Sequence, residues 1–555
     1  MKKNLIGVIL CFGLMQVLNA QTLAWAKGID AASTNTGYDI VSDAAGNVYV
    51  SGQFSGTTDF DPGVGTSNLT SVGVFDAFAA KYDASGNLIW AKQMGGAIAE
   101  GAISRGIELD ASGNVYIIGE FTGTADFDPN AGVANLTSFN SDIFICKLSS
   151  TGTYMWAKNI GGTNPAYGIA IEVDGSGNVY TTGQFQSTAD FDPGVGVSNM
   201  SAVNGDAFLS KLDTDGDFVW AIQFGGTGSD GGNALYIDDA DDIYITGSFG
   251  NTIDFDPGVG INNLTSTGQS DVFICKLDGD ANHLWSTSFG GTLDDIGNSI
   301  TVDAFDNIYV TGNYEGTTDF DPGVAVENAT AVGTYDVFVS KFNAAGSFVW
   351  AKQFGGSTFD FGMSIATDQS GKVYVGGIYQ TTVDFDPGAG TFNNTSAGTR
   401  DMFIQKLDSM GNFINVKLFG GSSDDNLKAI HVDASNNIYS TGEFNGTVDF
   451  DPNSGTVNLA STGQQDAFIL KLSQSNAGIN EIVQINISIY PNPATSQITL
   501  QTTEVIKQIS IFNLSGQVVQ TENKNTFSVQ NLHAGIYVLQ VQTEGGISTA
   551  RFVKE

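Results

Sequence analysis

Short apolar stretches alternate with turn residues along most of the chain. In one representative segment, residues 106–110 alternate apolar and polar side chains, residues 115–121 are almost continuously apolar, and apolar runs return at 142–148 and 153–158. Turns such as Asp110-Ala-Ser-Gly-Asn114 separate neighbouring runs. This pattern predicts four β-strands joined by hairpins, with one long connector between the second and third strands. No stretch carries a sustained helical period.

This four-strand segment is one copy of a repeat. The tetrapeptide Asp59-Phe60-Asp61-Pro62 lies in the long connector, and it returns with its first Asp at positions 126, 190, 254, 319, 384 and 449. A fixed period of 64 to 67 residues indicates one structural module used repeatedly. The 70 Gly residues of the whole chain also favour short strands and tight turns.

The strands at the two ends of the repeat region complement each other. The predicted fourth strand carries a Trp in most units, and Trp25 belongs to a fourth strand that has no first three strands before it. The last unit, residues 426–472, has three strands and no fourth. The N-terminal strand can therefore complete the last sheet. We expect an all-β, seven-bladed β-propeller with 3+1 closure by this strand. The Trp residues are expected to pack between neighbouring sheets.

The repeated Asp pairs are the first candidate site. In an extended segment the two Asp side chains point to one face and Phe to the other, so Phe is expected to be buried. Pro followed by Gly63 or its equivalent suggests a type II turn with positive φ at the Gly. Two interpretations of the carboxylates remain open: a turn stabilised by local N–H groups, and an oxygen-ligand site for calcium. The candidate ligands are Asp59, Asp61, Asp126, Asp128, Asp190, Asp192, Asp254, Asp256, Asp319, Asp321, Asp384, Asp386, Asp449 and Asp451.

Charge and cysteine content narrow the partners and the compartment. A net charge of −37 argues against nucleic acid and anionic membranes as partners. Residues 1–20, with Lys2, Lys3 and an apolar run, have the form of a secretory signal peptide and are too short for a membrane anchor. Cys146 and Cys275 occupy the same slot in different units, so a disulfide between them is not expected.

The repeat resembles the seven-bladed propeller repeats (SBBP type) of secreted bacterial proteins, which implies the fold and leaves function open. We assign residues 21–473 to the propeller and 474–484 to a linker. The C-terminal residues 485–555 contain Tyr490-Pro-Asn-Pro-Ala494, Asn513-Leu-Ser-Gly516 and Ala534-Gly-Ile-Tyr537 in alternating apolar blocks. They predict a small β-sandwich. These motifs resemble the type A C-terminal sorting domain of the type IX secretion system of Bacteroidetes-type bacteria. The resemblance implies recognition by that machinery and a secreted or outer-membrane surface location, reached through the periplasm.

The sequence offers no recognisable catalytic motif. His283, His431 and His533 lie in different units and have no nucleophile motif beside them, and seven alike Asp pairs lack the unlike carboxylates that a glycosidase needs. Only the 238–242 turn and the pairs at 294–295 and 424–425 depart from the pattern. We therefore expect a monomeric, non-enzymatic binding or adhesion scaffold for a glycan or protein. The alternative is an extracellular polysaccharide- or peptide-degrading enzyme with its site at the propeller axis.

Overall fold

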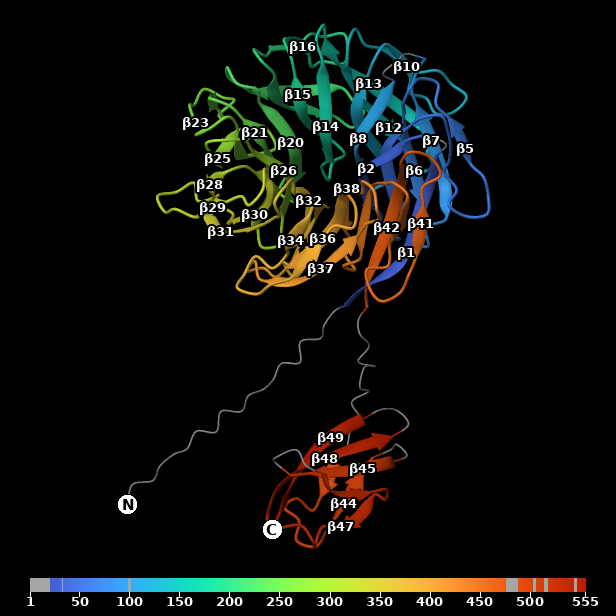
Figure 1. Cartoon of the computed structure of the whole chain (residues 1–555), viewed down its shortest axis with the longest axis vertical. Helices are drawn as coiled ribbons and strands as arrows, with labels where there is room; N and C mark the ends of the chain where they lie inside the picture. Colours follow the sequence, from blue (N-terminus) through green and yellow to red (C-terminus); the bar gives the residue numbers. More distant parts are fainter. Residues whose placement is uncertain are drawn as a thin grey trace. The chain divides into compact units, whose positions relative to one another are not determined.

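The computed structural model describes residues 20–31, 33–97, 101–475, 488–502, 506–513, 518–543 and 547–555. The predicted signal peptide, except Ala20, and most of the predicted linker lie outside these residues. Every regular element that is described is a β-strand, so the all-β class is confirmed. One compact unit spans Thr22–Ser473, and the C-terminal residues belong to a second (Figure 1). No helix long and apolar enough to cross a membrane occurs in the described part of the chain.

Sheets of four antiparallel strands make up the larger unit. The strands β2 (Asn35–Ser42), β3 (Val48–Phe54), β6 (Asp76–Tyr82) and β7 (Leu88–Met94) follow one another in a single sheet. The same order recurs in β8 (Ala102–Leu109), β9 (Val115–Phe121), β12 (Asp142–Leu148) and β13 (Tyr154–Gly162); β14 (Ala166–Val173), β15 (Val179–Phe185), β18 (Asp206–Leu212) and β19 (Phe218–Phe224); β20 (Gly231–Ile237), β21 (Ile243–Phe249), β24 (Asp271–Leu277) and β25 (His283–Gly291); β26 (Asp295–Val302), β27 (Ile308–Tyr314), β30 (Asp336–Phe342) and β31 (Phe348–Phe354); and β32 (Phe361–Thr367), β33 (Val373–Tyr379), β36 (Asp401–Leu407) and β37 (Phe413–Phe419).

The last sheet contains the N-terminal strand. Its order is β38 (Asn426–Val432), β39 (Ile438–Phe444), β42 (Asp466–Ser475) and then β1 (Ala20–Ala31), and Figure 1 shows blue β1 beside orange β42. The backbone N–H of Ala31 donates to Asp466 Oδ1 at 3.1 Å. The strand order therefore has the arrangement expected from the sequence. That β1 fastens a seven-bladed ring stays a prediction.

Each long connector folds into a short hairpin, which the sequence did not predict. The Asp-Phe-Asp-Pro motif begins at the end of the first strand of this hairpin. Where pairing is found, the hairpin extends the outer strand of the preceding sheet, as in Asp59 opposite Asp30 and Asp190 opposite Gly161. The hairpins are β4 (Thr57–Asp59) with β5 (Asn68–Thr70), β10 (Thr124–Asp126) with β11 (Asn135–Thr137), β16 (Thr188–Asp190) with β17 (Asn199–Ser201), β22 (Thr252–Asp254) with β23 (Asn263–Thr265), β28 (Thr317–Asp319) with β29 (Asn328–Thr330), β34 (Thr382–Asp384) with β35 (Asn393–Thr395), and β40 (Thr447–Asp449) with β41 (Asn458–Ala460).

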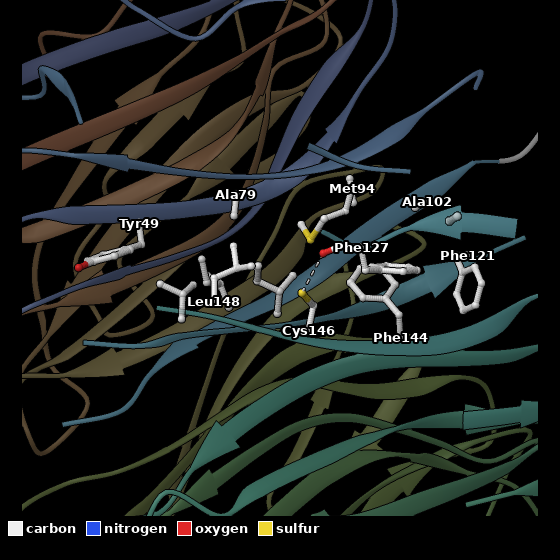
Figure 2. Close-up of a cluster of buried hydrophobic side chains, with 14 of the residues drawn as sticks. Tyr49, Ala79, Met94, Ala102, Phe121, Phe127, Phe144, Cys146 and Leu148 are labelled. Atoms are coloured by element: carbon white, nitrogen blue, oxygen red, sulfur yellow. Dashed lines mark hydrogen bonds between the residues drawn. The ribbon is translucent and has the colours of Figure 1, made fainter. Parts of the chain in front are cut away.

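The motif Phe anchors this hairpin in the core, as predicted. Phe127 is fully buried, and its ring centroid lies 4.7 Å from Phe144 and 5.2 Å from Phe121. Figure 2 shows these rings beside Cys146, whose thiol approaches the carbonyl oxygen of Phe127 at 3.8 Å. Cys146 and Cys275 are both free and buried. The connector is therefore a packed part of the fold.

The C-terminal unit is a two-sheet β-structure, as predicted. One sheet contains β43 (Ser488–Tyr490), β44 (Gln497–Gln501) and β47 (Thr526–Ser528), and the other contains β46 (Val518–Glu522), β45 (Ile506–Phe512), β48 (Gly535–Thr543) and β49 (Ile547–Lys554). Asn492 of the Tyr-Pro-Asn-Pro motif accepts the N–H of Val553 at 2.9 Å and donates to the carbonyl of Arg551 at 3.1 Å. The motif is thus attached to the last strand. The predicted turn at 513–516 lies, apart from Asn513, outside the described residues.

Candidate functional site

The carboxylates of the Asp-Phe-Asp-Pro loops are occupied by local N–H groups. Asp59 Oδ1 accepts the N–H of Asp61 at 3.0 Å and of Ser67 at 2.8 Å, and Asp61 Oδ1 accepts the N–H of Gly63 at 2.8 Å. The same bonds recur in the other connectors, for example at Asp190 and Asp192. This geometry supports the structural-turn interpretation.

The expected type II turn is wrong. Neither Gly63 nor its counterparts are among the residues with positive φ. A Cβ on Gly65 would instead lie 2.1 Å from Asp61 Oδ2. Six of the seven loops have glycine at this position, where the backbone passes close to the carboxylate, and the loop that begins at Asp319 has Ala325 there.

Calcium binding by these loops stays a prediction. The described residues contain no group of three or more His, Cys, Asp or Glu side chains that could hold a metal ion. Two carboxylates in each loop still have lone pairs beyond those used by the N–H groups, and backbone carbonyls can supply further calcium ligands.

A cavity of about 510 Å³ lies on the axis of the larger unit. The first strands of successive sheets contact one another in a circle, from β2 through β8, β14, β20, β26 and β32 to β38, which contacts β2. Residues from all of these strands line the cavity. Because inner strands do not pair with each other, side chains satisfy part of their exposed backbone. Ser364 Oγ accepts the N–H of Ile430 at 3.1 Å, and Asp39 Oδ2 accepts that of Ile107 at 2.9 Å.

The repeats differ in amino-acid sequence at positions that line this cavity. One register position holds a different side chain in almost every sheet. In chain order its occupants are Val41, Glu108, Glu172, Tyr236, Thr301, Ala366 and His431. A chemically uneven ring inside an otherwise regular repeat is the usual form of a binding site in a symmetric scaffold.

Three carboxylates from adjacent inner strands face this cavity. Asp39 lies on β2, Glu108 on β8 and Glu172 on β14. Burial raises the pKa of Asp39 to about 6, although the N–H groups of Ile107 and Ile40 oppose the rise. Burial, with repulsion from Asp39, raises the pKa of Glu108 to about 7. Burial, followed by repulsion from Glu108 and Asp39, raises the pKa of Glu172 well above its usual range.

Tyr236 and His431 line the cavity at the same register position as Glu108 and Glu172. Burial, followed by repulsion from Glu172, raises the pKa of Tyr236 to about 12. Burial lowers the pKa of His431 to about 4, against the attraction of Asp433. Tyr236 and His431 are therefore neutral at physiological pH, and the negative charge at this end comes from the carboxylates.

Two basic residues line another level of the cavity. Arg105 lies three residues before Glu108 on its strand, and Lys428 lies three residues before His431. Arg105 forms an ion pair with Glu120 at 2.6 Å, and its guanidinium lies 4.7 Å from the ring of Tyr38. Lys428 lies 3.6 Å from Glu443. Each cation therefore has its own carboxylate, and neither forms an ion pair with the three acidic residues.

No motif in the sequence predicts this site. His431 had no expected role, and the expected departures from the repeat were the 238–242 turn and the pairs at 294–295 and 424–425. Asp295 and Asp425 are instead buried residues that accept backbone N–H groups of Gly291 and Gly421. Superposing the seven inner-strand segments and asking where they differ would have revealed Glu108, Glu172 and His431.

The Trp side chains have a structural role, as expected. Trp90 Nε1 donates to the carbonyl of Ser150 at 3.3 Å, and Trp156 donates to that of Thr214 at 3.2 Å, each in the next sheet. Seven Lys side chains pack over Tyr rings in the same regular way, for example Lys147 over Tyr116 at 4.7 Å. The Lys–Tyr contacts repeat with the module, unlike the cavity lining, and the Trp bond recurs at Trp25 and Trp350 but not at Trp220 or Trp285.

Comparisons with known proteins identify both parts of the chain. Residues 488–555 match the family model of the secretion system C-terminal sorting domain, and residues 284–313 match that of the β-propeller repeat. The chain is 22% identical over 502 residues to an uncharacterized WD repeat-containing protein of Acanthamoeba polyphaga mimivirus, covering 76% of this chain and 36% of the relative. It is 23% identical over 405 residues to the regulatory protein FlaEY of Caulobacter vibrioides, covering 67% and 41%. The chain thus spans about two fifths of the length of these relatives.

Solved structures that the chain matches include the WD40 β-propeller domain of Doa1, with 8% identity, 82% of this chain and 98% of that chain covered, and a TM-score of 0.39. Another is a rhamnogalacturonan lyase of Bacillus licheniformis, with 13% identity, coverage of 81% and 91%, and a TM-score of 0.26. The sorting domain indicates export and a secreted or cell-surface location. The chain therefore combines β-propeller repeats with a C-terminal sorting domain of the type IX secretion system.

Proposed function

We propose that this protein is an exported, non-enzymatic binding protein whose propeller holds a small polar ligand in the axial cavity. The observation that carries the proposal is the concentration of repeat-to-repeat differences at the cavity lining. The core Phe residues, the connector turns and the Lys–Tyr contacts recur from sheet to sheet, whereas the register position that holds Glu108 and Glu172 in two sheets holds Tyr236 and His431 in two others.

The dimensions and the lining support a small ligand. A volume of about 510 Å³ falls within the roughly 300–1,000 Å³ of typical small-molecule sites. The lining mixes carboxylates, amides such as Asn233 and Asn298, and apolar residues. This combination suits a glycan unit or a peptide side chain that offers several hydrogen-bond donors.

A ligand screen on the purified full chain tests the proposal. Glycan and small-molecule panels would be followed by titration of each hit into a variant with a filled cavity, Thr301→Trp. The control is Val349→Trp, at an exposed position on β31 outside the cavity. We expect Thr301→Trp to abolish binding and Val349→Trp to leave it unchanged. Equal loss in both variants, or in neither, would contradict the proposal.

A hydrolase with its site at the axis is the second candidate. Asp39 and Glu108 occupy unlike environments: Asp39 accepts two backbone N–H groups, at 2.8 and 2.9 Å, whereas Glu108 has a pKa of about 7. A carboxyl group that is protonated near neutral pH beside an ionised one is the pairing used in glycoside hydrolysis. The test is product release from polysaccharides and peptides, with Glu108→Gln expected to abolish it.

Calcium binding by the acidic connectors is a separate proposal, supported by the paired carboxylates in each loop. A monomeric state is also proposed.

A further inference from the structure

The charge of the axial cavity narrows the class of ligand. Asp39, Glu108 and Glu172 come from three consecutive inner strands, and each is close enough to another for electrostatic repulsion. None of the ion pairs found among the described residues involves any of the three. Because Arg105 and Lys428 are already paired with Glu120 and Glu443, no protein cation neutralises the three acidic residues, and the lining becomes negative as they ionise. A negative, partly enclosed cavity concentrates cations.

Glu172 is the group that most requires a donor. It lines the cavity, and burial is the main reason why its charged form is disfavoured. No hydrogen bond to its carboxylate is found within the described ranges, whereas Asp39 accepts two N–H groups and Glu108 accepts that of Leu109 at 2.8 Å. Without a donor the Glu172 carboxyl group is held in its protonated form, and a cationic ligand that donates hydrogen bonds to it would favour the ionised form.

The arrangement suits an organic cation better than a metal ion. The three carboxylates do not form a metal-binding group, since none is found in the part of the chain that the structure describes. Carboxylates that are too dispersed for one small ion can still accept separate N–H bonds from an ammonium group, which has three donors. Tyr236, beside Glu172, adds an aromatic ring that favours cations.

We propose that the axial cavity binds an organic primary amine and that Glu172 and Glu108, supported by Asp39, hold its ammonium group. This inference rests on the proposed binding function and gives it a ligand class. An amino sugar or a polyamine would present the same ammonium chemistry.

Isothermal titration of the full chain tests this inference with four probes: glucosamine, glucose, cadaverine and Ca²⁺. Glucosamine and glucose differ in the amine, whereas cadaverine lacks the sugar. We expect at least one of the two amines to bind and glucose not to bind, and we expect any binding of Ca²⁺ to be unchanged in Glu172→Gln. Binding of glucosamine alone identifies an amino sugar as the source, and binding of cadaverine alone identifies a polyamine.

Isosteric substitutions test which carboxylates bind the ammonium group. Glu172→Gln and Glu108→Gln are each expected to weaken amine binding about tenfold to a hundredfold, which corresponds to one lost charge-assisted hydrogen bond. Glu327→Gln, on an exposed connector, is the matched control and should bind as the wild type does. Unchanged affinity in both cavity variants would overturn the inference.

The pH dependence provides an independent readout. The titratable groups that line the cavity are the three carboxylates, Tyr38, Tyr236 and His431, together with Arg105 and Lys428, which are paired with Glu120 and Glu443. Burial raises the pKa of Tyr38, so this residue also stays neutral over the range tested. Between pH 5.5 and 8 the alkylammonium groups of cadaverine stay protonated and His431 stays neutral, so only the carboxylates change charge in that titration. Glucosamine, whose amine loses its proton near pH 8, is compared only below about pH 6.5. Amine affinity should therefore rise with pH. Binding of a neutral ligand with no pH dependence, lost in Thr301→Trp, would overturn the amine inference and leave the proposed binding function standing.

Discussion

The indole Nε1 of Trp25 donates a hydrogen bond of 3.0 Å to the carbonyl oxygen of Ala84. Trp25 lies on the N-terminal strand β1, and Ala84 lies in the hairpin between β6 and β7. The bond has the same form as those from Trp90 to Ser150 and from Trp350 to Ser409 within the continuous part of the repeat. The N-terminal strand thus occupies the position of an ordinary outer strand.

If β1 closes the ring, a cavity in its buried face will destabilise the whole propeller. Ile29 on β1 is fully buried against the core that includes Val50 and Phe78. We expect Ile29→Ala to lower the free energy of unfolding by about 3 kcal/mol in urea titrations. Thr22→Ala, at an exposed position on the same strand, should change it little. A wild-type urea midpoint for Ile29→Ala would show that β1 is dispensable.

The connector turns depend on the first Asp of each motif. Asp190 Oδ1 accepts the N–H groups of Asp192 at 3.1 Å and Ser198 at 2.8 Å. Asp190→Ala leaves both donors without this acceptor, so we expect a loss of about 1–3 kcal/mol in the free energy of unfolding. Asp215→Ala, an exposed residue in a hairpin turn, is the comparison and should be nearly neutral. Equal losses in the two variants would argue against a specific turn role.

Because protein N–H groups already stabilise these turns, calcium should not be required for stability. The proposed calcium binding by these loops predicts a higher melting temperature of the full chain in millimolar Ca²⁺ than in EGTA, and equal melting temperatures would contradict it. A site that binds calcium only in the folded state would add about 2.7 kcal/mol at a hundredfold excess over Kd. A rise in melting temperature with Ca²⁺ that is smaller in Asp190→Ala would assign calcium binding to the loops.

Stability should fall as the pH rises through the neutral range. Burial raises the pKa of Asp295 to about 7 and those of Asp206, Asp360 and Asp425 to about 6. The native state therefore holds these protons more tightly than the unfolded chain, and stability is lost between about pH 4 and 7 as they dissociate. His431, with a pKa of about 4, has the opposite effect: below pH 6.5 its contribution to stability falls as the pH falls.

Four carboxyl groups with raised pKa outweigh the single opposing effect of His431. We therefore expect the free energy of unfolding, measured by urea titration, to be about 2–4 kcal/mol larger at pH 5 than at pH 8. Below about pH 4, protonation of carboxylates with lowered pKa, such as Asp43 and Asp110, should reverse the trend. Asp295→Asn should reduce the difference between pH 5 and pH 8, whereas the exposed Asp280→Asn should not. Greater stability at pH 8 than at pH 5 would contradict this account.

The buried cysteines should be inert in the native protein. Burial raises the pKa of the Cys146 and Cys275 thiols, with a smaller contribution from Asp128 or Asp256. Thiolate is the reactive form, so we expect no reaction with a thiol reagent until urea unfolds the chain, and then full reaction of both thiols. Rapid labelling at neutral pH without denaturant would contradict the packing shown in Figure 2.

The fold was predictable from the sequence because its evidence is repeated in every module. Each copy of the Asp-Phe-Asp-Pro motif, each Trp and each hairpin turn gives the same local information, and Trp25 indicates where the N-terminal strand belongs. The connector hairpin was missed because strands of three residues leave almost no alternation to detect. The cavity was missed for the opposite reason. Glu108, Glu172 and His431 lie far apart in sequence and become neighbours only through the arrangement of the inner strands around the axis.

The most direct test of the account is a crystal structure of the full chain with the best ligand from the screen. The account predicts ligand density in the axial cavity, within hydrogen-bond distance of Glu172 or Glu108. Density confined to the acidic connectors or the outer surface, with the cavity holding only water, would contradict it.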